Sequence, residues 1–500
     1  MEADPTGHSA AHFPRPFEGI YGVSLLTAIL ALVPYIIVTS AYTLFRKQVS
    51  HDIGAGATEL EIINGLSTAG YAFGALLGGD LINRFKQRYL FLICEGLFIV
   101  SCALAAAASG DVVYGAGRVL QGLMTGLLLV IALPPVIQRF PPRRMPTTAA
   151  AINIGFFGAV TVGPLLGGIT AYGHAWRAFY AALGALGCLT WLLALLTLPD
   201  AEPPNPDMRF DFAAIALGLP ATALPFWAVG ELTGPGFTSP LFIVPLTVGV
   251  VCFVALLLVE YHRKEPLAPV KQMWHTLPLV GTLAAMIGGA TFFTLMMLAQ
   301  QYLLSVAHGS MLQGGLPFWP QVVGVLITAA LLGLLLRTRM LPFLVLSGMV
   351  VLIGGGALLL TLRPGAEAHT VVLAAAGLLG LGAGATVSPG LYLAAFSLPS
   401  RIVGRTFALV ELVRSVADFI LAPVMLGVAR VASGSMHPNA AGLRFSIWLT
   451  LGVTIALTLG GAALYLLGGA GLPRPDLVAW IERNQPAIGS PPLVQTLRES

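Results

Sequence analysis

The sequence predicts an all-α polytopic membrane protein with about fourteen transmembrane helices. Its 500 residues are 56% hydrophobic and only 10% charged, whereas soluble domains carry about 25% charged residues. One hydrophobic core could not absorb this much apolar surface, so most of it must face lipid or neighbouring membrane helices. The net charge of +4 is carried by short loops between apolar runs, which argues against a nucleic-acid-binding surface.

Apolar stretches of about 18 residues or more are long enough to cross a bilayer. Cutting the chain at charged and Pro/Gly-rich breaks predicts spans at 20–45, 61–82, 88–109, 112–137, 147–172, 178–199, 212–231, 240–260, 278–304, 313–336, 340–362, 370–396, 406–429 and 445–468. Two longer loops flank the seventh and eighth spans, as expected for a helix pair inserted between two six-helix halves. We therefore expect an N-terminal tail (1–19), a six-helix bundle (20–199), a linker with two extra transmembrane helices (200–277), a second six-helix bundle (278–468) and a C-terminal tail (469–500).

The positions of lysine and arginine predict which side of the membrane each loop faces. Fourteen spans put both termini on one side. If that side is the cytoplasm, 18 of the 26 basic residues are cytoplasmic, and the opposite loops hold only Arg46, Lys47, Arg177, Arg363, Arg430 and Arg444. This positive-inside bias, and a first apolar run that lacks the features of a cleaved signal peptide, predict a multi-pass protein of the bacterial inner (cytoplasmic) membrane with both termini cytoplasmic.

The short turn after the second span carries the first of three glycine-containing motifs, Gly79 to Arg88 (GDLINRFKQR). A small residue followed by charged groups suits a gate between sliding helices, because the glycine allows close approach and the charges bind neighbouring helix ends. Gly79, Asn83, Arg84 and Arg88 are the candidates. The alternative is that these charges only set the topology.

The second motif lies in the fourth span and contains Arg118, Gln121 and Gly122. An arginine inside a membrane span costs about 2.5 kcal/mol or more, so we expect it to face a cavity or a carboxylate. Gly122 would allow a second helix to pack closely. The alternative for Arg118 is that its long side chain reaches the outer interface.

The third motif is a glycine row in the fifth span, with Gly158, Gly163, Pro164, Gly167 and Gly168. Pro164 removes a backbone hydrogen bond and should kink the helix, while the glycines let another helix approach. A kinked helix at a tight interface suits a hinge that opens the two sides of the membrane in turn. Generic packing is the alternative.

In this order, the three motifs resemble those of the major facilitator superfamily. The sequence further resembles the fourteen-helix drug:proton antiporter branch of that superfamily at four places: Trp176–Phe179, Phe210-Asp211, Glu260–Pro269 and Gln301–Pro320. The resemblance covers about residues 20–468 and implies secondary active transport. Members of that branch usually carry a helix 1 aspartate that is thought to take part in proton coupling, but here Pro34 occupies that stretch. In the loop motif, Asn83 and Lys86 replace an aspartate and a glycine.

Proton-coupling groups must therefore be sought elsewhere. Glu411, Arg414 and Asp418 lie at i, i+3 and i+7 of the thirteenth span, which places them on one helix face. Three ionisable side chains on one membrane face are costly unless they line water or pair with each other. A carboxylate beside a switchable arginine would suit proton-linked transport, and a static structural clamp is the alternative. Glu95 in the third span is a second candidate, near enough to the cytoplasm to be merely interfacial.

Polar and aromatic residues within the spans supply candidates for a substrate cavity: Tyr35, Asn153, Phe157, Gln300, Gln301, Trp319 and Gln321. Each of them could instead serve packing or capping. The sequence shows neither metal-ligand spacing nor a phosphate-binding glycine loop with lysine. It therefore predicts no metal, no other cofactor and no enzyme activity.

Together these observations predict a proton-coupled exporter of amphipathic or lipophilic small molecules that works by alternating access, with the proton gradient as energy source. The expected partners of a monomeric protein are the substrate and the lipid bilayer, without nucleic acid; a periplasmic adaptor is left open. The first alternative is uncoupled transport or exchange of an organic anion or lipid, which the missing helix 1 aspartate favours. The second is a membrane sensor that transports nothing, although a sensor would not need the hinge glycines.

Overall fold

The computed structural model describes residues 16–203, 205–206, 210–233, 236–263, 266–365, 367–472 and 474–493, and within these ranges the ordered elements are helices. Thirteen helices in the described part of the chain are long and apolar enough to cross a membrane. The remaining predicted span matches α3 (Ala57–Arg84), whose 28 residues include the polar side chains of Asn64, Ser67 and Thr68. The predicted all-helical membrane fold is confirmed.

Helices α1 to α7 belong to the first part of the chain. Besides α3 they are α1 (Tyr21–Leu30), α2 (Val33–Ile53), α4 (Gln87–Ala107), α5 (Asp111–Arg139), α6 (Met145–Tyr172) and α7 (Trp176–Thr197), with the short turn η1 (Pro142–Arg144). The inserted pair is α8 (Phe212–Gly230) and α9 (Pro240–His262), with η2 (Glu231–Thr233) between them. The last part contains α10 (Val270–Met273), α11 (Thr276–Ser305), α12 (Met311–Gly315), η3 (Leu316–Phe318), α13 (Pro320–Leu335), α14 (Leu341–Leu359), α15 (Glu367–Phe396), η4 (Ser400–Ile402), α16 (Val403–Ser433), α17 (Ala440–Leu467) and α18 (Leu477–Glu482).

The first predicted span is broken into two helices by Pro34. Because proline has no N–H and its ring clashes with the carbonyl four residues earlier, α1 stops at Leu30 and α2 begins afresh with Pro34 in its first turn. α2 then carries Tyr35 and Thr39 to the centre of the molecule.

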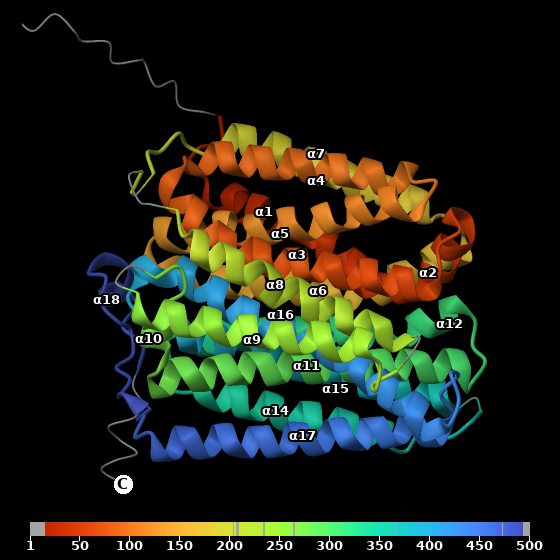
Figure 1. Cartoon of the computed structure of the whole chain (residues 1–500). Coiled ribbons are helices and arrows are strands. Elements are labelled where there is room, and N and C mark those ends of the chain that lie inside the picture. The colour runs from red at the N-terminus through yellow and green to blue at the C-terminus, as the bar shows by residue number, and fades with distance from the viewer. Residues whose placement is uncertain are drawn as a thin grey trace, which may run out of the picture.

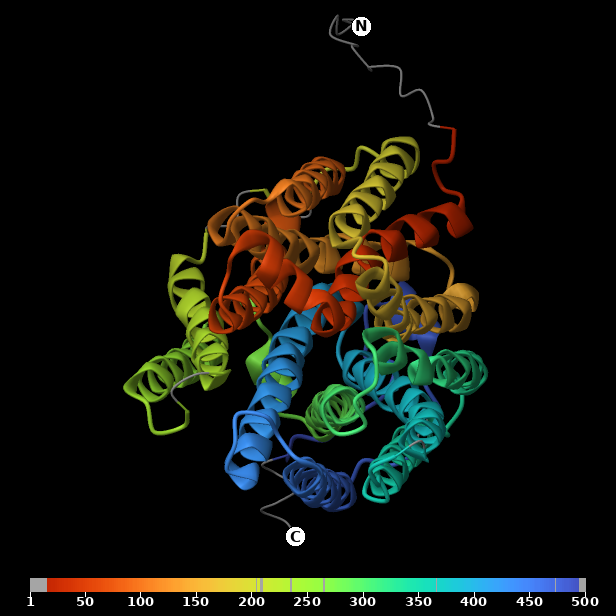
Figure 2. The same ribbon diagram turned by 90° about the vertical axis from the view of Figure 1, so that its right-hand side faces the viewer.

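The long helices lie side by side in two groups (Figure 1). One group contains α1 to α7 and the other α11 to α17; the end-on view in Figure 2 shows α8 and α9 on the outside, next to the junction of the groups. α8 contacts α3 of the first group and α16 of the second. We keep the five-part division of the chain as a proposal, with these groups as its two bundles.

Small residues set the closest helix contacts. Gly122 and Gly126 of α5 face the backbone carbonyls of Ser67 and Tyr71 of α3, where a Cβ atom would overlap the carbonyl oxygens. Apolar side chains gain little by leaving lipid for another helix, so packing of this kind, with backbones in contact, is a main source of helix association in membranes. As a consequence, one face of α3 is fixed against α5, and its other faces are free to contact other parts of the molecule.

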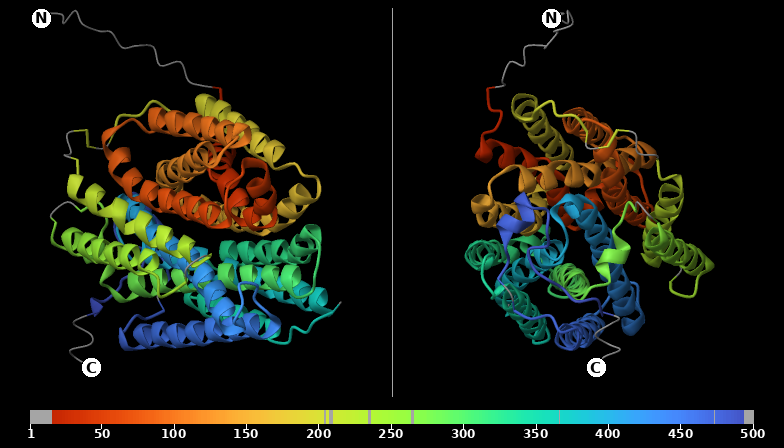
Figure 3. Two further views of the ribbon diagram at one scale, coloured as in Figure 1. Left: turned by 45° about the vertical axis from the view of Figure 1, so that its right-hand side comes forward. Right: turned by 90° about the vertical axis from the view of Figure 1, so that its left-hand side faces the viewer.

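Both described ends of the chain lie at the same face of the molecule, which we call the tail face; we call the opposite one the far face (Figure 3). There Phe17 N donates to Leu196 O at the end of α7 (3.3 Å). Trp480 of α18 is fully buried, its ring lies 5.0 Å from that of Phe396, and its indole N–H donates to Leu398 O (2.8 Å). The segment after α17 is therefore packed against the helix ends rather than hanging from them.

We predict that the tail face is cytoplasmic. A cysteine replacing Arg339, exposed in the turn after α13, should then react with an impermeant thiol reagent only when the inside of the membrane is made accessible. Met436→Cys, exposed in the loop after α16 at the far face, should react in intact cells. Cys188 and Cys252, the cysteines that are not buried, are first replaced by serine. The opposite labelling pattern would reverse the orientation.

Candidate functional site between the two helix groups

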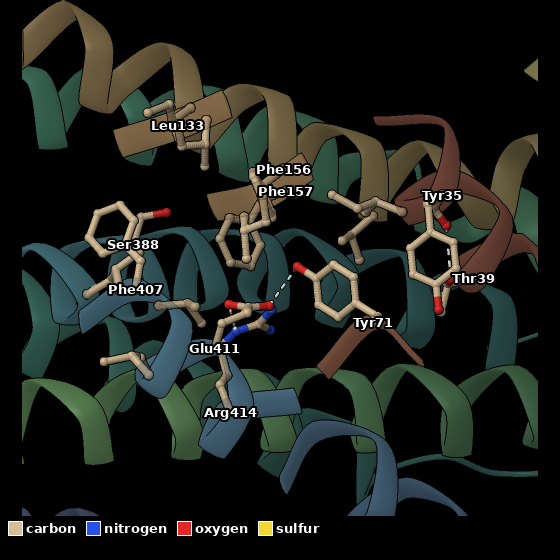
Figure 4. A pocket seen from close by; sticks show the side chains of 18 of the residues that line it. Tyr35, Thr39, Tyr71, Leu133, Phe156, Phe157, Ser388, Phe407, Glu411 and Arg414 are labelled. Atoms are coloured by element: carbon tan, nitrogen blue, oxygen red, sulfur yellow. Dashed lines mark hydrogen bonds and ion pairs between the residues drawn. The ribbon is translucent and has the colours of Figure 1, made fainter. Parts of the chain in front are cut away.

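A cavity, called here the central cavity, lies between the two groups (Figure 4). α2, α3, α5 and α6 line it from one side, and α11, α15 and α16 from the other. Its wall is mainly apolar, with rings from Tyr35, Tyr71, Phe156, Phe157, Phe293, Tyr392, Phe407 and Phe419; the charged groups among its described residues are Glu411 and Arg414. The volume is about 80 Å³, well below the roughly 300–1,000 Å³ of pockets that hold drug-sized ligands. A ligand of that size therefore requires the helices to move apart.

Arg414 lies between two carboxylates of its own helix. Its Nε donates to Glu411 Oε2 at 3.0 Å, and its two terminal nitrogens pair with Glu411 Oε1 and Asp418 Oδ2. The Tyr71 hydroxyl of α3 donates to Glu411 Oε1 at 2.8 Å, so the set also joins the two groups (Figure 4). Glu411 is 6% exposed and Asp418 is fully buried. The predicted stripe is thus a buried Glu–Arg–Asp ion cluster, which we call the α16 cluster.

Asp418 faces a second cavity, which we call the side cavity. It is lined by α2, α3, α8, α11 and α16 and has a volume of about 90 Å³. Gly289 of α11 makes room for the carboxylate, because a Cβ atom there would come within 2.5 Å of Asp418 Oδ1. Among the described residues, Oδ1 has no hydrogen-bond partner. The α16 cluster therefore touches both cavities, the central one through Glu411 and Arg414 and the side one through Asp418.

Glu95 lies apart from both cavities. It is fully buried in α4 against Gly187 of α7, and neither carboxylate oxygen has a hydrogen-bond partner among the described residues. Its burial differs from the interfacial position that the sequence allowed. The structure does not bring Glu95 together with Glu411 or Asp418.

Arg118 is fully buried inside the first group, so it does not reach the outer interface. Its terminal nitrogens donate to Gln121 Oε1 (2.8 Å) and Asn64 Oδ1 (3.2 Å). Its guanidinium carbon lies 5.8 Å from the ring centres of Tyr35 and Tyr42. Among the described residues no carboxylate pairs with it, so amide oxygens and aromatic faces carry its stabilisation.

The glycine row of α6 meets two different neighbours. Gly163 and Gly167 pack against Ser40 and Ala41 of α2, inside the first group. In contrast, the carbonyl of Pro164 meets Gly315, and Gly168 lies against the Met311 carbonyl; both of these contacts are to α12 of the second group. Only the latter pair belongs to the contact between the groups at the far face.

The glycine motif at the end of α3 holds this helix to the segment that leads to α8. The Asn83 side chain donates to Gly79 O (2.6 Å), Gly79 faces α16, and Arg84 pairs with Asp80 at 2.7 Å while stacking over the Phe210 ring at 4.0 Å. Sequence reasoning did not single out Asp80 or Phe210 as the partners of Arg84. The gating role of the motif stays a prediction.

The same turn also binds the end of α7. Arg88 donates to two of its last carbonyls, at 3.3 and 3.4 Å, where the negative end of the helix dipole favours a cation. Lys86, which replaces the glycine of the motif that this turn resembles, lies 2.7 Å from Glu202 and 3.2 Å from Asp200. These carboxylates raise the pKa of Lys86. The lysine thus fixes the chain that leaves the first group.

The seven candidates for the substrate cavity are distributed over several places. Tyr35 and Phe157 line the central cavity, and Gln300 lines the side cavity, where it accepts a hydrogen bond from Thr43 (3.0 Å).

The other four line neither cavity. Asn153 joins the groups by donating to Gly384 O (3.2 Å) and accepting from Ser388 (3.0 Å). Gln321 is buried, Gln301 is partly buried and Trp319 is 50% exposed.

The chain matches the model of the Major Facilitator Superfamily over residues 23–423. The chain belongs to this superfamily. It is 30% identical over 346 residues to the uncharacterised MFS-type transporter YubD of Bacillus subtilis, covering 67% of this chain and 65% of YubD. It is 26% identical to the drug efflux pump JefA of Mycobacterium tuberculosis (75% of this chain, 74% of JefA) and 26% identical to the puromycin resistance protein pur8 of Streptomyces alboniger (89% and 87%). The chain is therefore a multi-pass membrane transporter and, as predicted, not an enzyme.

Sequence reasoning missed Tyr71 and Phe407 in the cavity wall of this superfamily transporter. Apolar runs show which residues lie in the membrane but not which face of each helix points inward. A signal was present in α3, because Asn64, Ser67, Thr68 and Tyr71 lie at i, i+3, i+4 and i+7 and so form one polar face. On this face Asn64 and Thr68 line the side cavity and Tyr71 lines the central one, whereas Ser67 donates to Arg118 O of α5.

The α6 contacts predict different effects for three leucine substitutions. Gly168→Leu should abolish transport with near-normal membrane expression, because the side chain would prevent the far-face contact with α12 from closing. Gly163→Leu should instead lower the yield of folded protein, because its neighbours Ser40 and Ile37 belong to the same group. Gly158→Leu is the matched control, since beyond its own helix nothing described lies near that position.

Expression and transport of all three variants are measured side by side. Wild-type transport by Gly168→Leu would rule out the α6–α12 contact as a moving interface.

Proposed function

We propose that this transporter is a proton-coupled exporter of amphipathic or lipophilic small molecules that works by alternating access. The observation that carries the proposal is the α16 cluster: two buried carboxylates share one arginine, and one of them accepts a hydrogen bond from Tyr71 in the opposite group.

The charge of the cluster supports competition between a proton and a cationic amphipathic substrate. With all three side chains ionised, Glu411, Arg414 and Asp418 carry a net charge of −1 in a buried site, which is costly inside a membrane. A proton on either carboxylate removes this charge, and so does a cation bound beside it. Because the two compete, release of the proton favours substrate binding, and proton binding favours substrate release. No covalent bond to the substrate is involved.

Proton binding also acts on the contact between the groups. A hydrogen bond to an ionised carboxylate contributes about 1.5–3 kcal/mol, more than one to a neutral acid. Protonation of Glu411 therefore weakens the bond from Tyr71. At the far face the α6–α12 contact holds the groups together, and at the tail face the Gln138 side chain donates to Ser400 O. Opening one of these contacts while the other stays closed is alternating access.

The wall of the central cavity supports an amphipathic substrate. Its rings offer apolar and cation–π contacts without fixed hydrogen-bond geometry, which suits recognition of varied lipophilic molecules. The names of two relatives, the drug efflux pump JefA and the puromycin resistance protein pur8, agree with this class.

The remaining parts of the proposal follow from the sequence. They are a monomer in the bacterial inner membrane with cytoplasmic termini, energised by the proton gradient without a bound cofactor. Gly79, Asn83, Arg84, Arg88, Arg118, Gln121, Gly122 and, from the α6 row, Pro164 and Gly168 serve conformational change in this proposal, and an adaptor protein is not required for it.

One observation favours a second candidate, uncoupled transport or exchange of an organic anion or lipid. Pro34 stands in the stretch of helix 1 where related antiporters carry an aspartate, and in this structure it begins α2. The α16 cluster would then be a static clamp.

The test uses purified protein in proteoliposomes with ethidium as a fluorescent lipophilic cation. The wild type should accumulate ethidium in response to an imposed pH gradient. Asp418→Asn and Glu411→Gln should each lower this response by about tenfold or more, because the buried acid can no longer take up a proton, while ethidium binding stays measurable.

Glu95→Gln is the matched control, because it removes a buried carboxylate that lies away from both cavities, and it should keep the gradient response. A normal pH response in both α16 variants would show that coupling does not run through this cluster. A wild type that equilibrates ethidium without regard to the gradient would favour the uncoupled candidate.

A further inference from the structure

The side cavity differs in chemistry from the central one. Its described lining includes the hydroxyl and amide groups of Thr39, Thr43, Asn64, Thr68 and Gln300 beside Asp418, whereas the central wall is mainly aromatic and aliphatic. A water molecule needs at least about 10–15 Å³ of such space and two to four polar partners. With about 90 Å³, the side cavity has room for several water molecules but not for a drug-sized ligand.

The side cavity runs from a partly exposed ion pair to a buried acid. Toward the far face its wall includes Arg46 and Glu61, which pair with each other and whose side chains are 26% and 19% exposed. At its inner end lies Asp418, fully buried, with Oδ1 unpartnered among the described residues. Polar side chains thus lead from the partly exposed end of the cavity to a carboxylate oxygen that has no hydrogen-bond partner among the described residues.

The inserted helix pair closes this passage toward lipid. Phe226 and Gly230 of α8 line the cavity, and α8 is held close because Gly65 of α3 meets the Phe226 carbonyl while Gly230 meets Ile62. Polar groups exposed to hydrocarbon are strongly unfavourable. Without α8, a water-filled passage along α3 would be open to the acyl chains.

The two cavities share part of their wall, but each of them reaches the α16 cluster at a different carboxylate. Thr39, Phe293 and Phe419 line both, and Arg414 joins Glu411 on the central side to Asp418 on the other. A proton arriving at Asp418 therefore reaches the cluster without crossing the ring-lined wall that faces the substrate.

The charged groups around Asp418 come from three helices. Arg414, Glu411 and Arg430 lie on its own helix, and Arg46 of α2 and Glu61 of α3 lie on the other helices that line the side cavity. Glu61 neutralises Arg46, while Arg430 donates to Leu232 O (3.2 Å) and makes no ion pair among the described residues. Its positive charge opposes the entry of any cation, and a proton differs from a metal ion in that it can pass along hydrogen-bonded water without a hydration shell of its own.

We propose that the side cavity is the water-filled route by which protons from the far face reach Asp418, separate from the substrate cavity, with α8 as its wall toward lipid. This rests on the proposed function. In the step itself, a hydronium ion transfers its proton to Oδ1 of the ionised Asp418 carboxylate, which leaves a water molecule and a neutral acid; on release the acid returns the proton to water and becomes a carboxylate again.

The first test fills the cavity. Ala422→Phe and Thr68→Phe place rings in its wall at two buried positions, one on α16 and one on α3. Ethidium affinity should stay within about twofold of the wild type, while gradient-driven accumulation falls about tenfold. The matched control is Val410→Phe, also on α16 but lining the central cavity, which should weaken ethidium binding itself. Replacing sodium by choline in the assay buffer should leave the gradient-driven ethidium accumulation of the wild type unchanged.

The second test measures water access without transport. In the background with Cys188 and Cys252 replaced by serine, Thr43→Cys should react with a charged thiol reagent from the far face at least about tenfold faster than Cys94, which is buried outside both cavities.

Several outcomes would overturn the route. They are full gradient response in both filled variants, an unreactive Thr43→Cys, or a strong dependence on sodium, which would make this a sodium path. If the filled variants misfold, the reactivity of Thr43→Cys alone decides whether the route exists. If the wild type ignores the pH gradient, the proposed function fails as well; if only the filled variants behave as wild type, the route alone fails.

Discussion

Arg414 keeps its charge inside the membrane because Glu411 and Asp418 flank it on the same helix face, and this arrangement dictates what its neighbours must provide. A buried ion pair is stable only if its remaining polar atoms are also satisfied or hydrated. Tyr71 satisfies one oxygen of Glu411 from the opposite group, and Gly289 leaves the space in which the Asp418 carboxylate fits. The hydrogen bond from Tyr71 is the part of this arrangement that places the cluster where the two groups meet.

α3 shows how this polar centre can exist in a molecule that is surrounded by lipid. One of its faces packs on α5 through backbone contacts at Gly122 and Gly126, which need no large apolar side chains. Another face is polar, and its residues Asn64, Thr68 and Tyr71 line the cavities. α8 covers part of what remains. The same helix therefore joins the bundle, the ion cluster and the inserted pair, and its modest apolarity follows from serving all three.

The sequence carried enough information for the helical fold, since runs of apolar residues leave no other solution in a bilayer. It also placed Glu411, Arg414 and Asp418 on one face, because helical periodicity is a local property. It could not show that Tyr71 completes this set, since contact across 340 residues depends on how two bundles meet. For the same reason Glu95 could not be separated from the centre, and Gly163 and Gly168 could not be assigned to different interfaces.

The break at Pro34 illustrates a further limit of sequence reasoning. Composition alone gave one long first span, and the resemblance drew attention to Pro34 only as the residue that stands in place of an acid. Its backbone effect is as consequential, because α2 restarts there and directs Tyr35 and Thr39 toward the cavities. A single residue inside a predicted span can thus change both the chemistry of a helix and its path.

The docked C-terminal segment has a consequence for how the second group moves. Thr276 at the start of α11 donates to Pro491 O (3.2 Å), while Ile488 donates to Phe396 O at the end of α15 (3.0 Å). One stretch of chain thereby ties the ends of two helices that both line the central cavity. Such a tie resists their separation at the tail face, so the second group should swing there as a stiff unit while the far face retains more freedom to flex.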